Sequence, residues 1–148
     1  MNTTLEMMER IPFFSGFSHA EKEMLAVGNR SFVRFKDGEV IIQQGDFENS
    51  AVFIILTGAA SVRKEEYRNH IIDYIETGSI VGEAAFLVNG RSRMASIIAD
   101  GIVEAFTLDR NTMEQFDCAL QLKITRKLAE IIVERLDKMH SAMAALID

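Results

Sequence analysis

The sequence has 148 residues, of which 48 % are hydrophobic and 26 % charged, which is typical of one folded domain with a single core. Its net charge of −6 argues against a general nucleic-acid or anionic-membrane surface, because such binding depends on basic side chains. The single cysteine, Cys118, excludes an internal disulfide, and no apolar run reaches the roughly 20 residues of a membrane span. The start, MNTTLEMMER, lacks a signal peptide's apolar run. We therefore expect a single cytoplasmic domain over residues 1–148, with no nucleic-acid or membrane partner.

The N-terminal part, about 1–29, is predicted to contain two helices, over 4–10 and 19–29. Both starts have the capping-box spacing, in which a hydroxyl and a carboxylate satisfy free helix amides: Thr3 with Glu6, and Ser18 with Glu21. Between the helices, the only proline of the chain and three aromatic residues predict a compact apolar turn that packs on the body of the domain: Pro12, Phe13, Phe14 and Phe17.

From about 30 to 109 the sequence changes to short β-rich runs separated by glycines. These runs are SFVRF, EVIIQ, AVFIILT, AASVRK, HIIDYI, MASIIA and VEAFTL. The breaks lie at Lys36-Asp37-Gly38, Gly45-Asp46, Thr57-Gly58 and Thr77-Gly78-Ser79. So many short strands at near-regular spacing favour a roll or jelly roll over a parallel α/β sheet. The predicted class is therefore α+β, mainly β.

Helical signals return in the C-terminal part, about 110–148. Asn111 is a plausible N-cap, with Glu114 three residues later, and the segment 120–147 has helical periodicity throughout. One face carries an apolar stripe with heptad-like spacing, formed by Ala129, Ile132, Leu136, Met139, Met143 and Leu146. The stripe predicts a homodimer through this helix in a parallel pair. The alternative is that it covers the chain's own roll, with the methionines filling gaps.

The segment VGEAAFLVNGRSRMASI, at 81–97, contains the strongest functional signal. Gly82 permits a tight turn, the residues after it are helix-tolerant, and Asn89-Gly90 terminates a short helix. The free amides at a helix start form an anion site, and a guanidinium from Arg91 or Arg93 can add two parallel hydrogen bonds. The carboxylate of Glu83 is unfavourable beside an anion unless it accepts a hydrogen bond from a hydroxyl of the ligand, such as that of a sugar. Phosphate and sugar together indicate a nucleotide.

Residues 82–96 resemble the phosphate-binding cassette of the cyclic nucleotide-binding domain family, which occurs in catabolite-activator-type regulators, cyclic-nucleotide-dependent kinases and gated channels. GEVIIQQGD at 38–46 and VFIILTGAASV at 52–62 are similar to the family's earlier strands and glycine turns, so the resemblance covers nearly the whole chain. It implies a double-stranded β-helix, or jelly-roll-like β-roll, flanked by N-terminal helices and a long C-terminal helix.

By this resemblance, Glu83 accepts from the ribose 2′-hydroxyl, and Arg93 rather than Arg91 pairs with the phosphate, because Arg93-Met94-Ala95 matches the family's Arg-small-Ala. Met94 departs from the usual small residue and could narrow or block the site. The implied ligand-binding residues are Gly82, Glu83, Ala84, Ala85, Arg93, Met94 and Ala95. The implied base pocket has an apolar wall of Val62, Ile72 and Ile75, with Arg135, Met139 and His140 from the C-terminal helix near the base.

No motif indicates catalysis. His19, His70 and His140 are widely separated, so the sequence predicts neither a metal site nor an enzyme, and no cofactor. We expect a cyclic nucleotide as ligand, cAMP in preference to cGMP, and a role as a ligand-sensing regulatory switch. The alternative is a degenerate domain of the same fold that binds no nucleotide and serves as a dimerisation or protein-interaction module.

Overall fold

The computed structural model describes residues 3–26 and 31–147, and the side chains of positions 3 and 4 lie outside the described part. The chain divides into two units, Met1–Met113 and Glu114–Asp148, and each is considered by itself. The expectation of a single domain over the whole chain therefore stays a prediction.

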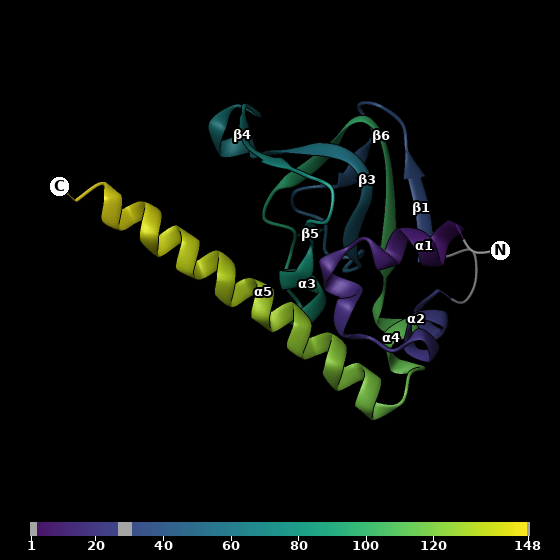
Figure 1. Ribbon diagram of the computed structural model, residues 1–148. Coiled ribbons are helices and arrows are strands. Elements are labelled where there is room, and N and C mark those ends of the chain that lie inside the picture. The colour runs from purple at the N-terminus through teal and green to yellow at the C-terminus, as the bar shows by residue number, and fades with distance from the viewer. Residues whose placement is uncertain (1–2, 27–30, 148) are drawn as a thin grey trace. The chain divides into compact units, whose positions relative to one another are not determined.

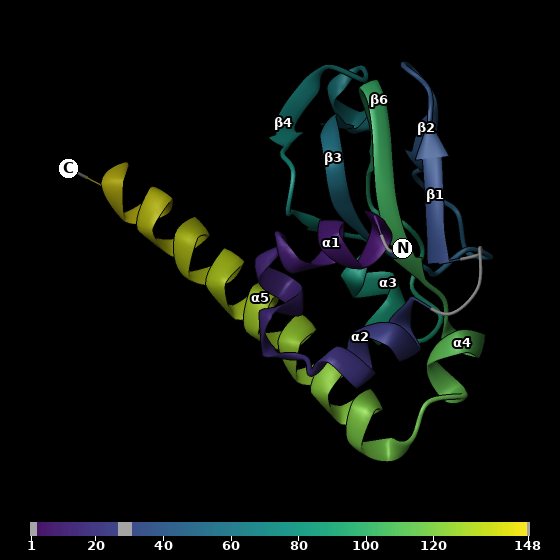
Figure 2. The same cartoon turned by 45° about the vertical axis from the view of Figure 1, so that its right-hand side comes forward.

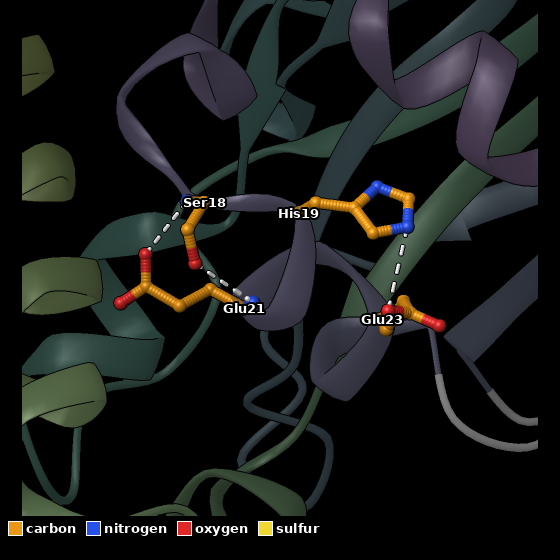
Figure 3. Close-up of polar contacts among 4 residues, drawn as sticks. All are labelled: Ser18, His19, Glu21 and Glu23. Atoms are coloured by element: carbon orange, nitrogen blue, oxygen red, sulfur yellow. Dashed lines mark hydrogen bonds and ion pairs between the residues drawn. The ribbon is translucent and has the colours of Figure 1, made fainter.

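The first unit begins with three short helical elements: α1 (Thr3–Glu9), η1 (Pro12–Gly16) and α2 (His19–Leu25). The predicted capping box at the start of α2 is confirmed and is drawn in Figure 3. The Ser18 amide donates to Glu21 Oε1 at 2.8 Å, and the Glu21 amide donates to Ser18 Oγ at 3.1 Å. The matching box at Thr3 falls on a side chain outside the described residues. The predicted span 19–29 is too long, because α2 ends at Leu25 with Ala26 as its C-cap, and positions 27–30 lie outside the described residues.

The predicted aromatic turn is confirmed as a packing element. Phe13, Phe14 and Phe17 are buried, and Phe14 meets the ring of Phe106 edge to face at 5.4 Å between centroids. Since Phe106 lies on a strand of the sheet, this contact fixes the N-terminal helices to the β-roll.

Six strands follow: β1 (Phe32–Phe35), β2 (Val40–Ile42), β3 (Val52–Arg63), β4 (Ile71–Ile75), β5 (Ile80–Val81) and β6 (Ser96–Leu108). A one-turn 3-10 helix, η3 (Glu65–Tyr67), lies between β3 and β4. All pairs are antiparallel, in the order β1-β6-β3-β4, with β2 also paired to β6 and β5 to β3 (Figures 1 and 2). The predicted β-roll with flanking helices is confirmed.

Two strands are longer than predicted. β3 runs through the expected break at Thr57-Gly58, and β6 joins two runs that we expected to be separate. The β3–β6 register shifts around Thr57, and Gly58 has φ +97°. A Cβ at position 58 would collide with the Ile102 carbonyl oxygen. Gly58 is therefore the site of a bulge within a continuous strand, not of a turn between strands.

The core of the roll is formed by the inward residues of β2, β3, β5 and β6. Ile55, Ala60 and Val103 are fully buried within it, and Val62 and Ile75 pack against it from β3 and β4. Alternate residues of a strand face opposite sides, so this packing fixes which side chains point into the roll.

The C-terminal part contains α4 (Arg110–Glu114) and α5 (Cys118–Ala145), which confirms the long C-terminal helix. The predicted N-cap at Asn111 is wrong, because the Asp109 carboxylate accepts from the Thr112 amide and Asn111 lies inside the helix. Asp117 caps α5 in the same way, through the Leu120 amide. Over 3–26 and 31–147, the structure has no helix that combines the length and apolar character needed to cross a membrane.

Candidate functional site

The candidate site is built around α3 (Glu83–Leu87), the predicted short helix within the β-roll. Gly82 is its N-cap, in the left-handed region with φ +83°. A Cβ at this position would lie 2.6 Å from Arg93 Nη1 and 2.9 Å from the Ala51 carbonyl oxygen. Both the backbone conformation and the space available therefore require glycine before α3. Figure 2 shows α3 at the end of the roll nearer to α1 and α2.

The side chain of Arg93 lies directly against the start of α3. It is only 4 % exposed, and its guanidinium donates from Nη1 to the Gly82 carbonyl at 3.0 Å and from Nη2 to the Ala51 carbonyl at 2.6 Å. These bonds join the loop before β6 to the turn before α3 and to the residue before β3. Two of the five guanidinium N–H groups are used in these two hydrogen bonds.

The backbone of Arg93 is held as firmly as its side chain. Its amide donates to the Asp46 carbonyl at 3.0 Å, and its carbonyl accepts from the Gly45 amide at 2.8 Å. Burial lowers the pKa of the Arg93 guanidinium, while the negative charges of Asp46 and Glu83 act in the opposite direction. Arg93 is thus a buried cation, and burial strengthens its attraction for an anion relative to water, whereas the charges of Asp46 and Glu83 oppose an anion at this place.

The structure separates the two arginines of the cassette. Arg91 is exposed and donates from Nη2 to the Met94 sulfur, and Met94 is itself 54 % exposed. Arg93 is buried and points to α3. Of the two, Arg93 is the arginine that lies against α3, and its role toward a phosphate stays a prediction. The long side chain of Met94 contacts Arg91 in the region next to the site.

The remaining predicted cassette residues lie on α3 or beside it. Glu83 is the first residue of α3 and is half-buried, whereas Ala84 is exposed. Ala85 is buried, and Ala95 is half-buried just before β6. The amides of Ala84 and Ala85 belong to the first turn of α3, where backbone amides have no acceptor within the helix.

Two residues of the predicted base wall come together. Val62 pairs with Asp73 across β3 and β4, and Ile75 pairs with Ala60, so Val62 and Ile75 share the core-facing side of the sheet. Ile72 lies at a register shift of the β3–β4 pair, between Asp73 opposite Val62 and Ile71 opposite Arg63, and it is 45 % exposed. Its place in the base wall stays a prediction.

The other three predicted base-pocket residues lie on α5, in the second unit. Met139 and His140 are exposed and Arg135 is half-buried. Their role beside a ligand stays a prediction.

Sequence reasoning missed three contributors to the site. Asp46 and Ala51 bind Arg93 through their carbonyls, and Arg110 donates from Nη2 to the Ala85 and Phe86 carbonyls at 3.0 Å each. The sequence marks the Gly45-Asp46 pair only as a strand break, and Arg110 gives no signal beyond its place after a strand. Among the described residues, no cluster of histidine, cysteine or carboxylate side chains could hold a metal ion.

Comparison with known families agrees with this geometry. The profile described as cyclic nucleotide-binding domain matches residues 32–117, which include β1 to β6 and the whole cassette.

Two curated relatives are named as regulatory subunits of cAMP-dependent protein kinase. The protein from Hypocrea atroviridis is 29 % identical over 137 residues, covering 90 % of this chain and 28 % of that protein. The protein from Mucor circinelloides f. lusitanicus is 37 % identical over 79 residues, covering 53 % of this chain and 18 % of that protein. The chain thus spans less than a third of the length of these relatives.

Among solved structures, a cyclic nucleotide-binding domain from Methylobacillus flagellatus KT has a TM-score of 0.77 at 22 % identity. The match covers 97 % of this chain and 82 % of that chain. This likeness shows the shared fold.

Proposed function

Since this chain belongs to the cyclic nucleotide-binding domain family, we propose that it binds a cyclic nucleotide at α3 and acts as a regulatory switch, not as an enzyme. cAMP is the preferred ligand in this proposal, in line with the names of the Hypocrea and Mucor relatives. Those names also make a protein kinase the first class of partner to test. A cytoplasmic location remains part of the proposal.

The observation that carries the proposal is the buried guanidinium of Arg93 at the start of α3. This guanidinium can form a charge-assisted, bidentate pair with a cyclic phosphate, a geometry that lysine cannot reproduce. Glu83, one position into α3, then accepts from the ribose 2′-hydroxyl. A switch also requires that the nucleotide bind one arrangement of the C-terminal helices better than another, because equal affinity shifts no equilibrium.

The test compares two single variants that differ only in which cassette arginine is lost. Arg93→Ala should weaken cAMP binding by about ten- to over a hundredfold, which corresponds to the loss of a charge-assisted pair of roughly 1.5–3 kcal/mol. Arg91→Ala should reduce the cAMP affinity far less. Calorimetric titration gives both affinities, and urea unfolding of each variant shows whether the fold is intact. Equal losses at the two positions, or the larger loss at Arg91, would contradict the assigned role of Arg93.

We also propose that the chain forms a homodimer through the apolar stripe of α5. Five residues of the stripe are large and exposed: Ile132, Leu136, Met139, Met143 and Leu146. Such a stripe with heptad-like spacing is the surface that a parallel helix pair would bury, and a pair of identical stripes makes a symmetric interface.

Light scattering at about 100 μM, well above micromolar dissociation constants, tests the dimer. The unmodified chain should have the mass of a dimer, and Leu136→Lys combined with Met143→Lys should shift it to the monomer. Ser141→Lys combined with Ala144→Lys is the matched control, because both residues are exposed on α5 and lie away from the stripe. A monomeric mass for the unmodified chain would contradict the dimer and leave the nucleotide site unaffected.

A further inference from the structure

The C-terminal end of α3 is held by a second arginine, Arg110. Its Nη2 lies 3.0 Å from both the Ala85 and the Phe86 carbonyl oxygens. The last carbonyls of a five-residue helix have no N–H donor inside the helix, and a cation at that end also interacts favourably with the negative end of the helix dipole. Arg110 therefore caps α3 from a distant part of the chain.

α3 thus has a guanidinium at each end. Arg93 donates to the Gly82 carbonyl before the helix, and Arg110 donates to the Ala85 and Phe86 carbonyls in its last turn. The two arginines flank β6, a strand that is paired with both β1 and β3. A movement of α3 relative to the fixed β6 must therefore change the contacts of at least one of them.

Arg110 is also the first residue of α4. Asp109, just before the helix, caps it: the Asp109 carboxylate accepts a hydrogen bond from the Thr112 amide, and the Asp109 carbonyl accepts one from the Met113 amide at 3.0 Å. The backbone of Arg110 is thus part of the first turn of α4, while its side chain is bonded to the last turn of α3. Along the chain, α4 leads directly to Asp117 and α5.

We propose that Arg110 is a positioning residue that couples α3 to the first turn of α4, so that a shift of α3 on ligand binding reaches the segment that leads into α5. The inference rests on the proposed function for its ligand, but the coupling itself lies in contacts within the chain. It assigns a mechanical role to one side chain and no contact with the nucleotide.

The first experiment needs no ligand. Amide hydrogen exchange is measured residue by residue in the whole chain and in Arg110→Met, which keeps a long apolar stem and removes every donor. Two amides report on the link: Val88, bonded to the Ala84 carbonyl at the end of α3, and Met113, bonded to the Asp109 carbonyl in α4. Both should exchange roughly tenfold faster in Arg110→Met, since each helix end loses a charge-assisted contact.

Three controls separate coupling from general destabilisation. Val103, fully buried in β6, reports global opening and should change much less than Val88 and Met113. Arg110→Lys keeps a cation that can donate to the same carbonyls, so it should restore most of the protection. Arg34→Met removes an exposed arginine of β1 and should change neither reporter. Acceleration of Val88 alone, or equal acceleration of all three amides, overturns the proposal.

The second experiment adds saturating cAMP. In the unmodified chain the nucleotide should change exchange both at 82–95 and at 110–116. Arg110→Met should keep the first response and lose the second, and a retained response at 110–116 overturns the coupling. If calorimetry shows that the unmodified chain does not bind cAMP, the proposed function fails, while the measurements without ligand still decide the role of Arg110.

Discussion

Replacing Gly82 by alanine is expected to destabilise the fold by about 2.5–5 kcal/mol. Gly82 has φ +83°, and the left-handed region costs a residue with a Cβ roughly 1–2 kcal/mol. The new Cβ would lie 2.6 Å from Arg93 Nη1, so the guanidinium must move away from the Gly82 carbonyl. The loss of that charge-assisted hydrogen bond adds about 1.5–3 kcal/mol.

Gly90→Ala is the matched control for this prediction. Gly90 also has a positive φ, +75°, but a Cβ there meets no atom within 4 Å. Gly90→Ala should therefore lower the free energy of unfolding only by the cost of the left-handed backbone, about 1–2 kcal/mol. Urea unfolding of both variants gives the two free energies, and their difference isolates the contact with Arg93 and Ala51. If Gly82→Ala costs no more than Gly90→Ala, the packing of Arg93 against this turn is not as described.

Three further predictions concern the ligand and one loop. Glu83→Gln should weaken the binding of cAMP and leave the binding of 2′-deoxy-cAMP almost unchanged, because 2′-deoxy-cAMP lacks the 2′-hydroxyl donor. If calorimetry shows that the affinity losses from the substitution and from the missing hydroxyl simply add, Glu83 does not bind the ribose. cAMP should bind more tightly than cGMP, because Met94 offers the guanine amino group no strong acceptor, and a tenfold preference for cGMP would refute this. The hydrogen bond from Gln44 lowers the pKa of the Glu66 carboxyl, so Gln44→Ala should raise that pKa in an NMR titration; an unchanged value would exclude Gln44 as the cause.

The cassette could be predicted because its information is local. A glycine before the helix, a run of helix-tolerant residues and a terminating Asn-Gly are enough to predict α3 without knowledge of any distant contact. The strand ends were less predictable. Gly58 gives the same signal in a bulge as in a turn, and only its pairing with β6 shows that the strand continues.

The wrong N-cap has a simple physical cause. Asp109 and Asn111 are both good capping residues two positions apart, and the end of β6 at Leu108 decides which of them meets a free amide. The irregularity of β4 at Ile72 could not be predicted either, because a bulge of this kind follows from the pairing with β3 and not from the hydropathy of the strand.

The contacts of the two arginines at the ends of α3 were beyond sequence reasoning. Arg93 reaches the Ala51 carbonyl, 42 positions away, and Arg110 reaches the Ala85 carbonyl, 25 positions away. Backbone carbonyls carry no sequence signature, so these bonds become visible only when the roll closes. The resemblance indicated that Arg93 matters, but not that it is already bound within the fold.

Calorimetric titration of the unmodified chain with cAMP, cGMP and 5′-AMP tests the central claim most directly. A cyclic-phosphate site at Arg93 and α3 predicts saturable binding of cAMP with one site per chain, weaker binding of cGMP, and little binding of 5′-AMP, which lacks the cyclic phosphate. The absence of binding by either cyclic nucleotide at high micromolar concentration, with the chain folded, would contradict the account.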